Sequence, residues 1–165
     1  KPTYEGESIE LVAVDTKDEV VGFLDIEIEQ RPGSLCLHSE HPRGAFAWEF
    51  GVVRRLWGRG LGTRMVRRAE QLLAAQYDVH YVEWWSTDRR SQKWYERYGM
   101  ECIDTHWRFT VRDVGAADCL DGEVRLVNAL LTCPVDTWAK VRGRLDVITT
   151  PPLEPRLCRG YAHRF

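Results

Sequence analysis

The first fifty or so residues show the two-residue period that is typical of β-strands. Ser8–Val14 and Val20–Glu29 are rich in β-branched residues, and the second run ends in alternating apolar and polar residues. A short polar segment separates the two runs, which predicts an antiparallel hairpin. Ala45–Val53 is a third predicted strand, with Phe46, Trp48, Phe50 and Val52 on one face and Glu49 on the other.

Helical spacing begins after a glycine-rich segment. Within Thr63–Gln76, apolar residues recur every three or four positions, which predicts an amphipathic helix. Val79–Trp85 is another predicted strand, and a second helix is expected from Arg89 to Tyr98, between a cap at Asp88 and a terminating Gly99. Met100–Val111 predicts one or two further strands. The order β-β-β-α-β-α-β indicates a mixed α/β (α+β) fold.

The remainder of the chain, residues 112–165, has a different character. Gly115–Gly122 is loop-like, Asp136 is placed to cap a short helix through Trp138 and Val141, and Thr149–Pro155 is rich in proline. We therefore expect a core over residues 1–111 and a C-terminal extension over residues 112–165. A lid, a dimerisation arm and strands that complete the sheet are three open interpretations of this extension.

Composition narrows the class of protein. The 165 residues are 44% hydrophobic and carry a net charge of −2, which argues against a disordered chain and against a nucleic-acid-binding domain. No apolar run is long enough to cross a membrane, and the first residues do not resemble a secretory signal. The five cysteines contain no Cys-x-x-Cys pair, so we expect reduced thiols in a cytoplasmic protein. His38 and His41 lie in a predicted loop, which is read as a solvated loop and not as a metal site.

A glycine-dense turn between the third strand and the first helix carries the strongest chemical signal. Gly58, Gly60 and Gly62 leave the backbone accessible, and the first turn of a helix offers unpaired N–H groups, so the segment is suited to bind a pyrophosphate. Arginines surround it, at positions 54, 55, 59 and 64. The phosphate-binding loop of nucleotide hydrolases and the dinucleotide-binding fingerprint do not fit these residues. A tight connection that needs glycine only for packing is the alternative.

Two segments resemble the motifs of one family. The segment from Val52 to Gly62 resembles the signature Arg/Gln-x-x-Gly-x-Gly/Ala of the GCN5-related N-acetyltransferase (GNAT) superfamily, with Trp57 at the Arg/Gln position. The segment from Asp88 to Met100 resembles that family's Asn-x-x-Ala-x-x-x-Tyr-x-x-x-Gly-Phe segment, in which Tyr95 and Gly99 match. Here Asp88 replaces Asn, Ser91 replaces Ala and Met100 replaces Phe.

The resemblance implies a mixed, mostly antiparallel central sheet with flanking helices. Because only seven residues precede Ser8, much of the family's usual N-terminal portion is expected to be missing. It also implies acetyl-CoA as co-substrate, in the splay between the third and fourth strands, and no metal. The residues implied to bind it are Val52, Val53, Trp57, Gly58, Arg59, Gly60, Leu61, Gly62, Thr63, Asp88, Ser91 and Tyr95.

The activity implied by the resemblance is transfer of an acetyl group to a primary amine by direct attack in a ternary complex. Tyr95 is the expected general acid, because a phenol with a pKa of about 10 holds its proton at neutral pH. Glu49 and Glu83 are the candidate bases, and a backbone N–H near Val53 is the expected oxyanion donor. A small amine is the expected acceptor. A peptide acceptor, a non-catalytic acyl-CoA-binding domain and a homodimer remain open.

Overall fold

The computed structural model describes residues 6–37, 43–109, 125–127, 130–142 and 156–165. By compactness the chain divides into two units: Lys1–Trp84, Tyr95–Glu101 and Tyr161–Phe165 form the first, and Trp85–Trp94 and Cys102–Gly160 the second. The division at residue 111 expected from sequence stays a prediction.

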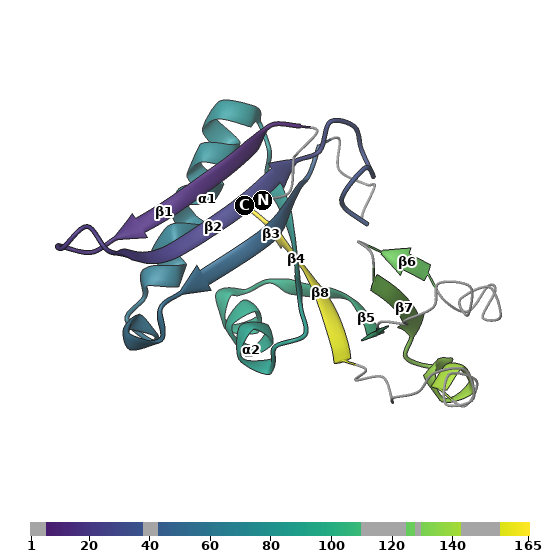
Figure 1. Cartoon of the computed structure of the whole chain (residues 1–165). Helices are drawn as coiled ribbons and strands as arrows, with labels where there is room; N and C mark the ends of the chain where they lie inside the picture. The colour runs from purple at the N-terminus through teal and green to yellow at the C-terminus, as the bar shows by residue number, and fades with distance from the viewer. Residues whose placement is uncertain (1–5, 38–42, 110–124, 128–129, 143–155) are drawn as a thin grey trace. The chain divides into compact units, whose positions relative to one another are not determined.

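The predicted strands and helices up to residue 109 are present, with ends within two residues of those expected. No helix in the described parts of the chain is long and apolar enough to cross a membrane. In chain order the elements are β1 (Ser8–Val14), β2 (Val20–Ile28), β3 (Ala45–Val52), the 3-10 helix η1 (Arg54–Leu56), α1 (Leu61–Tyr77), β4 (Tyr81–Ser86), α2 (Arg89–Tyr98), β5 (Glu101–Phe109), β6 (Arg125–Val127), β7 (Leu130–Pro134) and β8 (Arg156–Arg164). Figure 1 labels the strands and the helices α1 and α2.

Strand pairing within each unit is mostly antiparallel, which confirms the expected mixed sheet. In the first unit β1 pairs with β2 and β2 with β3, both antiparallel, whereas β3 pairs with β4 in parallel. The chain end adds to this unit, since the N–H of Phe165 donates to the carbonyl of His80 at 3.1 Å. In the second unit β7 pairs antiparallel with both β5 and β6.

One extra residue interrupts the alternation of β3. Its register with β2 shifts by one residue between Ala47 and Glu49, so Trp48 has no partner of its own in the ladder, which is a β-bulge. Phe46 and Phe50 consequently lie on opposite faces of the strand. The prediction that the aromatic residues of this strand share one face is therefore wrong, because a bulge is specified by pairing with another strand and not by the local pattern.

Helix α1 packs against β1, β2 and β3 (Figure 1). The side chains that it buries are Met65, Val66, Ala69 and Leu73. Gly22 on β2 allows this close approach, since an added Cβ would lie only 2.8 Å from the sulfur of Met65. The predicted helix is confirmed, and it begins at Leu61, directly after the glycine-dense turn.

The second unit contains its own aromatic cluster. The rings of Trp107 and Trp138 stack with centroids 5.2 Å apart, and Phe109 lies 5.4 Å from Trp138. Residues 138–142 form the short helix expected near Trp138. The described part of residues 112–165 thus contributes strands β6, β7 and β8 and this helix. The predicted loops at Gly115–Gly122 and Thr149–Pro155 lie outside the described residues, as do His38 and His41.

A buried carboxylate organises the connection between β2 and β3. Glu29, which is 1% exposed, accepts hydrogen bonds from the backbone N–H groups of Leu35 and Cys36 on Oε1 and of Gly44 on Oε2, at 2.9, 2.8 and 3.0 Å. The Cys36 thiol in turn donates to the carbonyl of Ala45. One side chain, at the start of this long connection, therefore satisfies backbone groups in its middle and at its far end, next to the start of β3.

We expect Glu29→Gln to destabilise the protein by about 2 kcal/mol. Glutamine is uncharged, and its NH2 group would face backbone N–H groups from which the carboxylate accepts hydrogen bonds. The free energy of unfolding in urea measures this. Glu49→Gln on the neighbouring strand is the control, since an exposed substitution changes stability by no more than about 0.5 kcal/mol. Equal effects of the two substitutions would contradict this role of Glu29.

Candidate functional site

The turn after β3 contains two residues in the left-handed region of backbone space. Gly58 has φ = 73° and Gly60 has φ = 76°, a conformation that side-chain-bearing residues rarely adopt. An added Cβ at Gly58 would meet nothing within 4 Å, and one at Gly60 would meet only the end of the Arg64 side chain, at 3.9 Å. Backbone conformation requires glycine at these two positions, and the space beside them is open.

Gly62 has a different role. It lies inside the first turn of α1, where an added Cβ would approach Cζ of Phe50 to 3.0 Å and a methyl carbon of Val52 to 3.9 Å. The packing interpretation of the turn therefore applies to this third glycine, whereas the first two shape the backbone.

The N-terminus of α1 keeps its positive character. Gly60 precedes the helix and provides no side-chain cap, and the first turn contains no acidic residue. The first backbone bond of the helix runs from the N–H of Arg64 to the carbonyl of Gly60 at 3.1 Å. The N–H groups of Leu61, Gly62 and Thr63 come before this bond and point out of the helix end, which is where an anion binds favourably.

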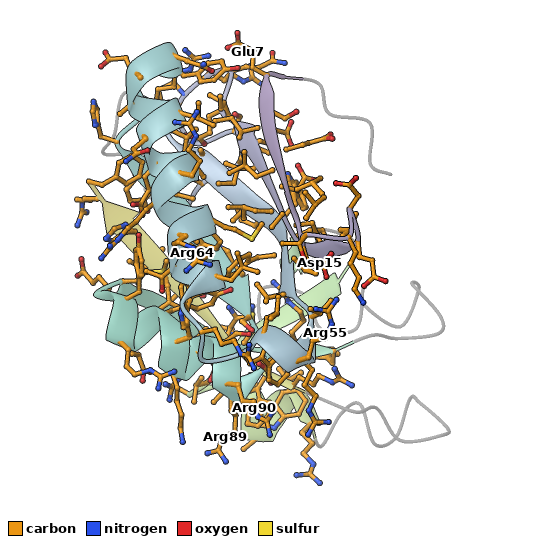
Figure 2. The ribbon with its side chains drawn as sticks, turned by 90° about the vertical axis from the view of Figure 1, so that its left-hand side faces the viewer. Glu7, Asp15, Arg55, Arg64, Arg89 and Arg90 are labelled. Atoms are coloured by element: carbon orange, nitrogen blue, oxygen red, sulfur yellow. The ribbon has the colours of Figure 1, made fainter. Side chains whose placement is uncertain are left out.

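The four arginines around this turn are not equivalent. Arg55 is engaged by the β1–β2 turn, where its guanidinium lies 3.0 Å from Asp15 and 3.1 Å from Glu19, and Figure 2 shows Arg55 beside Asp15. The backbone N–H of Lys17 and, less strongly, Arg55 hold the pKa of Asp15 below its usual value. Within the described residues, Arg54, Arg59 and Arg64 are exposed and form no ion pair. These three are the cations available to a ligand.

Trp57 ties the turn to the end of β3. Its indole N–H donates to the carbonyl of Val52 at 2.7 Å, while about half of the residue, 51%, stays exposed. The tryptophan at this position therefore supports the turn through the backbone that precedes it.

Pairing between β3 and β4 stops early. The register runs from Ala45 opposite Val82 to Ala47 opposite Trp84, after which β3 continues to Val52 without a further partner on β4 in the described register. The N–H of Val53 donates to the carbonyl of Val21 on β2 at 2.9 Å. Because backbone groups alternate along a strand, those of Val52 face the opposite edge, on the β4 side. The N–H of Val53 itself is thus engaged by β2, and the expectation of an oxyanion donor near Val53 stays a prediction.

The two candidate bases differ in their surroundings. Glu49 is exposed and lies opposite Asp25 on β2. Glu83 is fully buried, and its carboxylate accepts the Tyr81 hydroxyl at 2.7 Å and the backbone N–H of Leu37 at 3.0 Å. Glu83 therefore holds the β2–β3 connection in place together with Glu29, a role that no local pattern indicated.

Tyr95 lies on α2 within an aromatic group of the first unit. It is 6% exposed, and its ring centroid lies 5.8 Å from that of Trp84 and 5.2 Å from that of Tyr161. Tyr161 comes from the far end of the sequence, so sequence reasoning did not place it here. Tyr98 has a separate partner, since its hydroxyl donates to Glu70 at 2.9 Å, and burial followed by this hydrogen bond raises its pKa.

Asp88 and Ser91, expected from sequence to bind a coenzyme, belong to the second unit and contact each other. Oδ2 of Asp88 accepts both the N–H and the hydroxyl of Ser91, at 2.8 and 2.9 Å, which is the expected cap of α2. These two bonds, the backbone N–H first, lower the pKa of Asp88.

Comparisons with known proteins identify a family for the chain. A family model described as "Acetyltransferase (GNAT) family" matches residues 3–100. No curated protein sequence matches the chain.

Solved structures share the fold at low sequence identity. A putative acetyltransferase from Agrobacterium tumefaciens superposes with a TM-score of 0.53 at 12% identity, covering 98% of this chain and 77% of that one. NAA60 from Arabidopsis thaliana, in complex with a bisubstrate analogue, gives 0.53 at 12% identity, with 97% and 76% covered. A putative streptothricin acetyltransferase from Bacillus anthracis, in complex with acetyl coenzyme A, gives 0.54 at 13% identity, with 98% and 64% covered.

We expect Asp88→Asn to flatten the acid side of the stability profile. The folded-state pKa of Asp88 lies below its unfolded value of about 3.9, so its contribution is present above that pH and is lost as the pH falls through the folded-state pKa. An asparagine caps the helix equally well but does not titrate there. Urea unfolding between about pH 5 and pH 3 measures the slope. An unchanged slope in Asp88→Asn would contradict the prediction.

Proposed function

Because the chain belongs to the acetyltransferase (GNAT) family, we propose that it transfers an acetyl group from acetyl-CoA to a primary amine by direct attack within a ternary complex. One observation carries the proposal: the left-handed turn at Gly58 and Gly60 leads into an uncapped helix directly after a strand whose pairing with β4 has ended. This arrangement offers an anion site and a strand edge on one short segment.

The turn and the start of α1 are suited to hold the pyrophosphate of the coenzyme. The N–H groups of Leu61, Gly62 and Thr63 supply donors, and the open space beside Gly58 and Gly60 lets a bulky anion approach the backbone. Arg54, Arg59 and Arg64 supply charge without losing an existing ion pair. The pantetheine arm carries amides, and the backbone N–H of Val52 on the β4 side is the group that we propose pairs with it, since the Val52 carbonyl already accepts the indole N–H of Trp57. The predicted roles of Asp88 and Ser91 toward the coenzyme stay outside this proposal.

The reaction needs three proton or charge transfers. The amine nitrogen attacks the thioester carbon, a C–N bond forms, and the carbonyl electron pair moves onto oxygen. When the carbonyl reforms, the C–S bond breaks and the thiolate takes a proton. We assign that proton to the hydroxyl of Tyr95, whose ring is held in a buried aromatic group, as general-acid catalysis requires a fixed donor.

We assign the proton that leaves the amine to Glu49 in preference to Glu83. The Glu83 carboxylate is buried and already accepts two hydrogen bonds, from the Leu37 N–H and the Tyr81 hydroxyl, so it is engaged in holding the β2–β3 connection. Glu49 is exposed on the strand that ends at the turn, and it faces Asp25 across the ladder.

A small amine is the proposed acceptor, with a peptide amine and a non-catalytic coenzyme-binding role as alternatives. The relative solved with a bisubstrate analogue shares only the fold with this chain, at 12% identity. Release of CoA thiol with a panel of small amines and with peptide N-termini separates the three. Turnover on small amines supports the proposal, and turnover on peptides alone supports a peptide acceptor. Binding of acetyl-CoA without turnover on either supports a non-catalytic coenzyme-binding role.

We expect Gly60→Glu to weaken acetyl-CoA binding by at least about 10²-fold, because it places a carboxylate beside the site proposed for the pyrophosphate. Isothermal titration calorimetry measures the affinity. Gly99→Glu is the matched control, because Gly99 also has a positive φ (95°) and open space around its Cβ position, but lies at the end of α2. Undiminished affinity in Gly60→Glu would overturn the assignment of the turn.

We expect Tyr95→Phe to lower kcat by about 10²-fold or more while leaving acetyl-CoA affinity nearly unchanged, because the hydroxyl acts on the departing thiolate. Steady-state thiol release and calorimetry together measure the two effects. Tyr98→Phe loses a hydroxyl of the same helix that is bonded to Glu70, and it should keep its kcat. A near-normal rate in Tyr95→Phe would show that another group protonates the thiolate.

A further inference from the structure

Trp84 lies where β3 and β4 part. It is opposite Ala47 in the last described pair of the two strands, and it is 2% exposed. Its ring contacts Phe50, whose centroid lies 5.8 Å away, and Tyr95, also at 5.8 Å. The residue therefore joins the strand edge proposed for the pantetheine arm to the proposed general acid.

The indole N–H of Trp84 is buried and has no hydrogen-bond acceptor among the described residues. An indole nitrogen can only donate, and buried donors in native proteins are nearly always paired. Other tryptophans of this unit follow that rule, since Trp48 donates to Glu27 at 2.8 Å and Trp57 to the carbonyl of Val52 at 2.7 Å. An unpaired donor at this position thus points to an acceptor that arrives with a ligand.

The chemistry of acetyl transfer needs such a donor. Negative charge develops on the thioester oxygen when the amine attacks, and fixed hydrogen-bond donors stabilise it in a site without water. The backbone N–H of Val53 itself is not available for this role, because it is bonded to Val21. We propose that the indole N–H of Trp84 donates to the thioester carbonyl oxygen and stabilises the oxyanion, a role that rests on the proposed function.

In this step the amine nitrogen forms a bond to the carbonyl carbon, and the π pair becomes a lone pair on the oxygen that accepts the indole N–H. Collapse of the intermediate returns that pair to the carbonyl, breaks the C–S bond and sends its electrons to the thiolate. Tyr95 supplies the proton to sulfur, and the proton lost by the amine goes to the base. The two groups that meet negative charge, the indole of Trp84 and the phenol of Tyr95, are thus neighbouring rings in the structure.

Kinetics test the role first. Trp84→Phe keeps an aromatic ring but removes the N–H, so we expect kcat to fall by about 10²-fold with little change in the Kd of acetyl-CoA measured by calorimetry. Trp138→Phe, a Trp→Phe change in the aromatic cluster of the second unit, should keep both values. A near-normal kcat in a folded Trp84→Phe variant overturns the inference.

A spectroscopic readout on the wild-type protein does not depend on how the variant folds. The chain has seven tryptophans, so the indole N–H signal of Trp84 in a ¹H–¹⁵N spectrum is first assigned by through-bond correlation to its own backbone. Acetyl-CoA, added without an amine, should move this signal downfield, whereas CoA, which lacks the thioester carbonyl, should move it much less. Equal shifts with the two ligands, or no shift with acetyl-CoA that calorimetry shows to be bound, overturn the inference and leave the proposed function standing. Absence of acetyl-CoA binding overturns the proposed function itself and this inference with it.

Discussion

The early end of hydrogen bonding between β3 and β4 is the constraint on which the rest of the site depends. The two strands share the pairs from Ala45–Val82 to Ala47–Trp84, and β3 then runs on to Val52. The bulge at Trp48 lies directly after the last pair, and a bulge bends a strand and increases its twist. A strand edge that is left open inside a sheet is costly unless something pairs with it. This is why a ligand that carries amides is a natural occupant of this edge.

Much of the fold could be predicted because it is encoded locally. Periodicity placed the strands and helices, and the glycines at positions 58 and 60 indicated a turn that only glycine adopts without strain. The cap of α2 at Asp88 follows from residue type alone. In each case the sequence signal and the structural cause lie within a few residues of each other.

The parts that could not be predicted depend on pairings between distant segments. The bulge depends on the register with β2, and the commitment of the Val53 N–H depends on Val21. Glu83 resembles a base in sequence, but it bonds the backbone of Leu37, 46 residues earlier. Tyr161 joins the surroundings of Tyr95 across 66 positions of the chain. No local pattern specifies which polar group a carboxylate or an amide finds after the sheet has formed.

The ion pairs of Arg55 connect the β1–β2 turn to η1, which lies some forty residues later in the chain. Its guanidinium forms ion pairs with Asp15 and Glu19, and its backbone is part of η1. A displacement of the hairpin tip would therefore also displace the turn that follows η1. The tip is therefore a poor place for an inserted tag or a shortened loop, even though its side chains face solvent. Rising ionic strength would also act on this segment twice, once by screening the attraction between cations and a bound anion and once by loosening this tether.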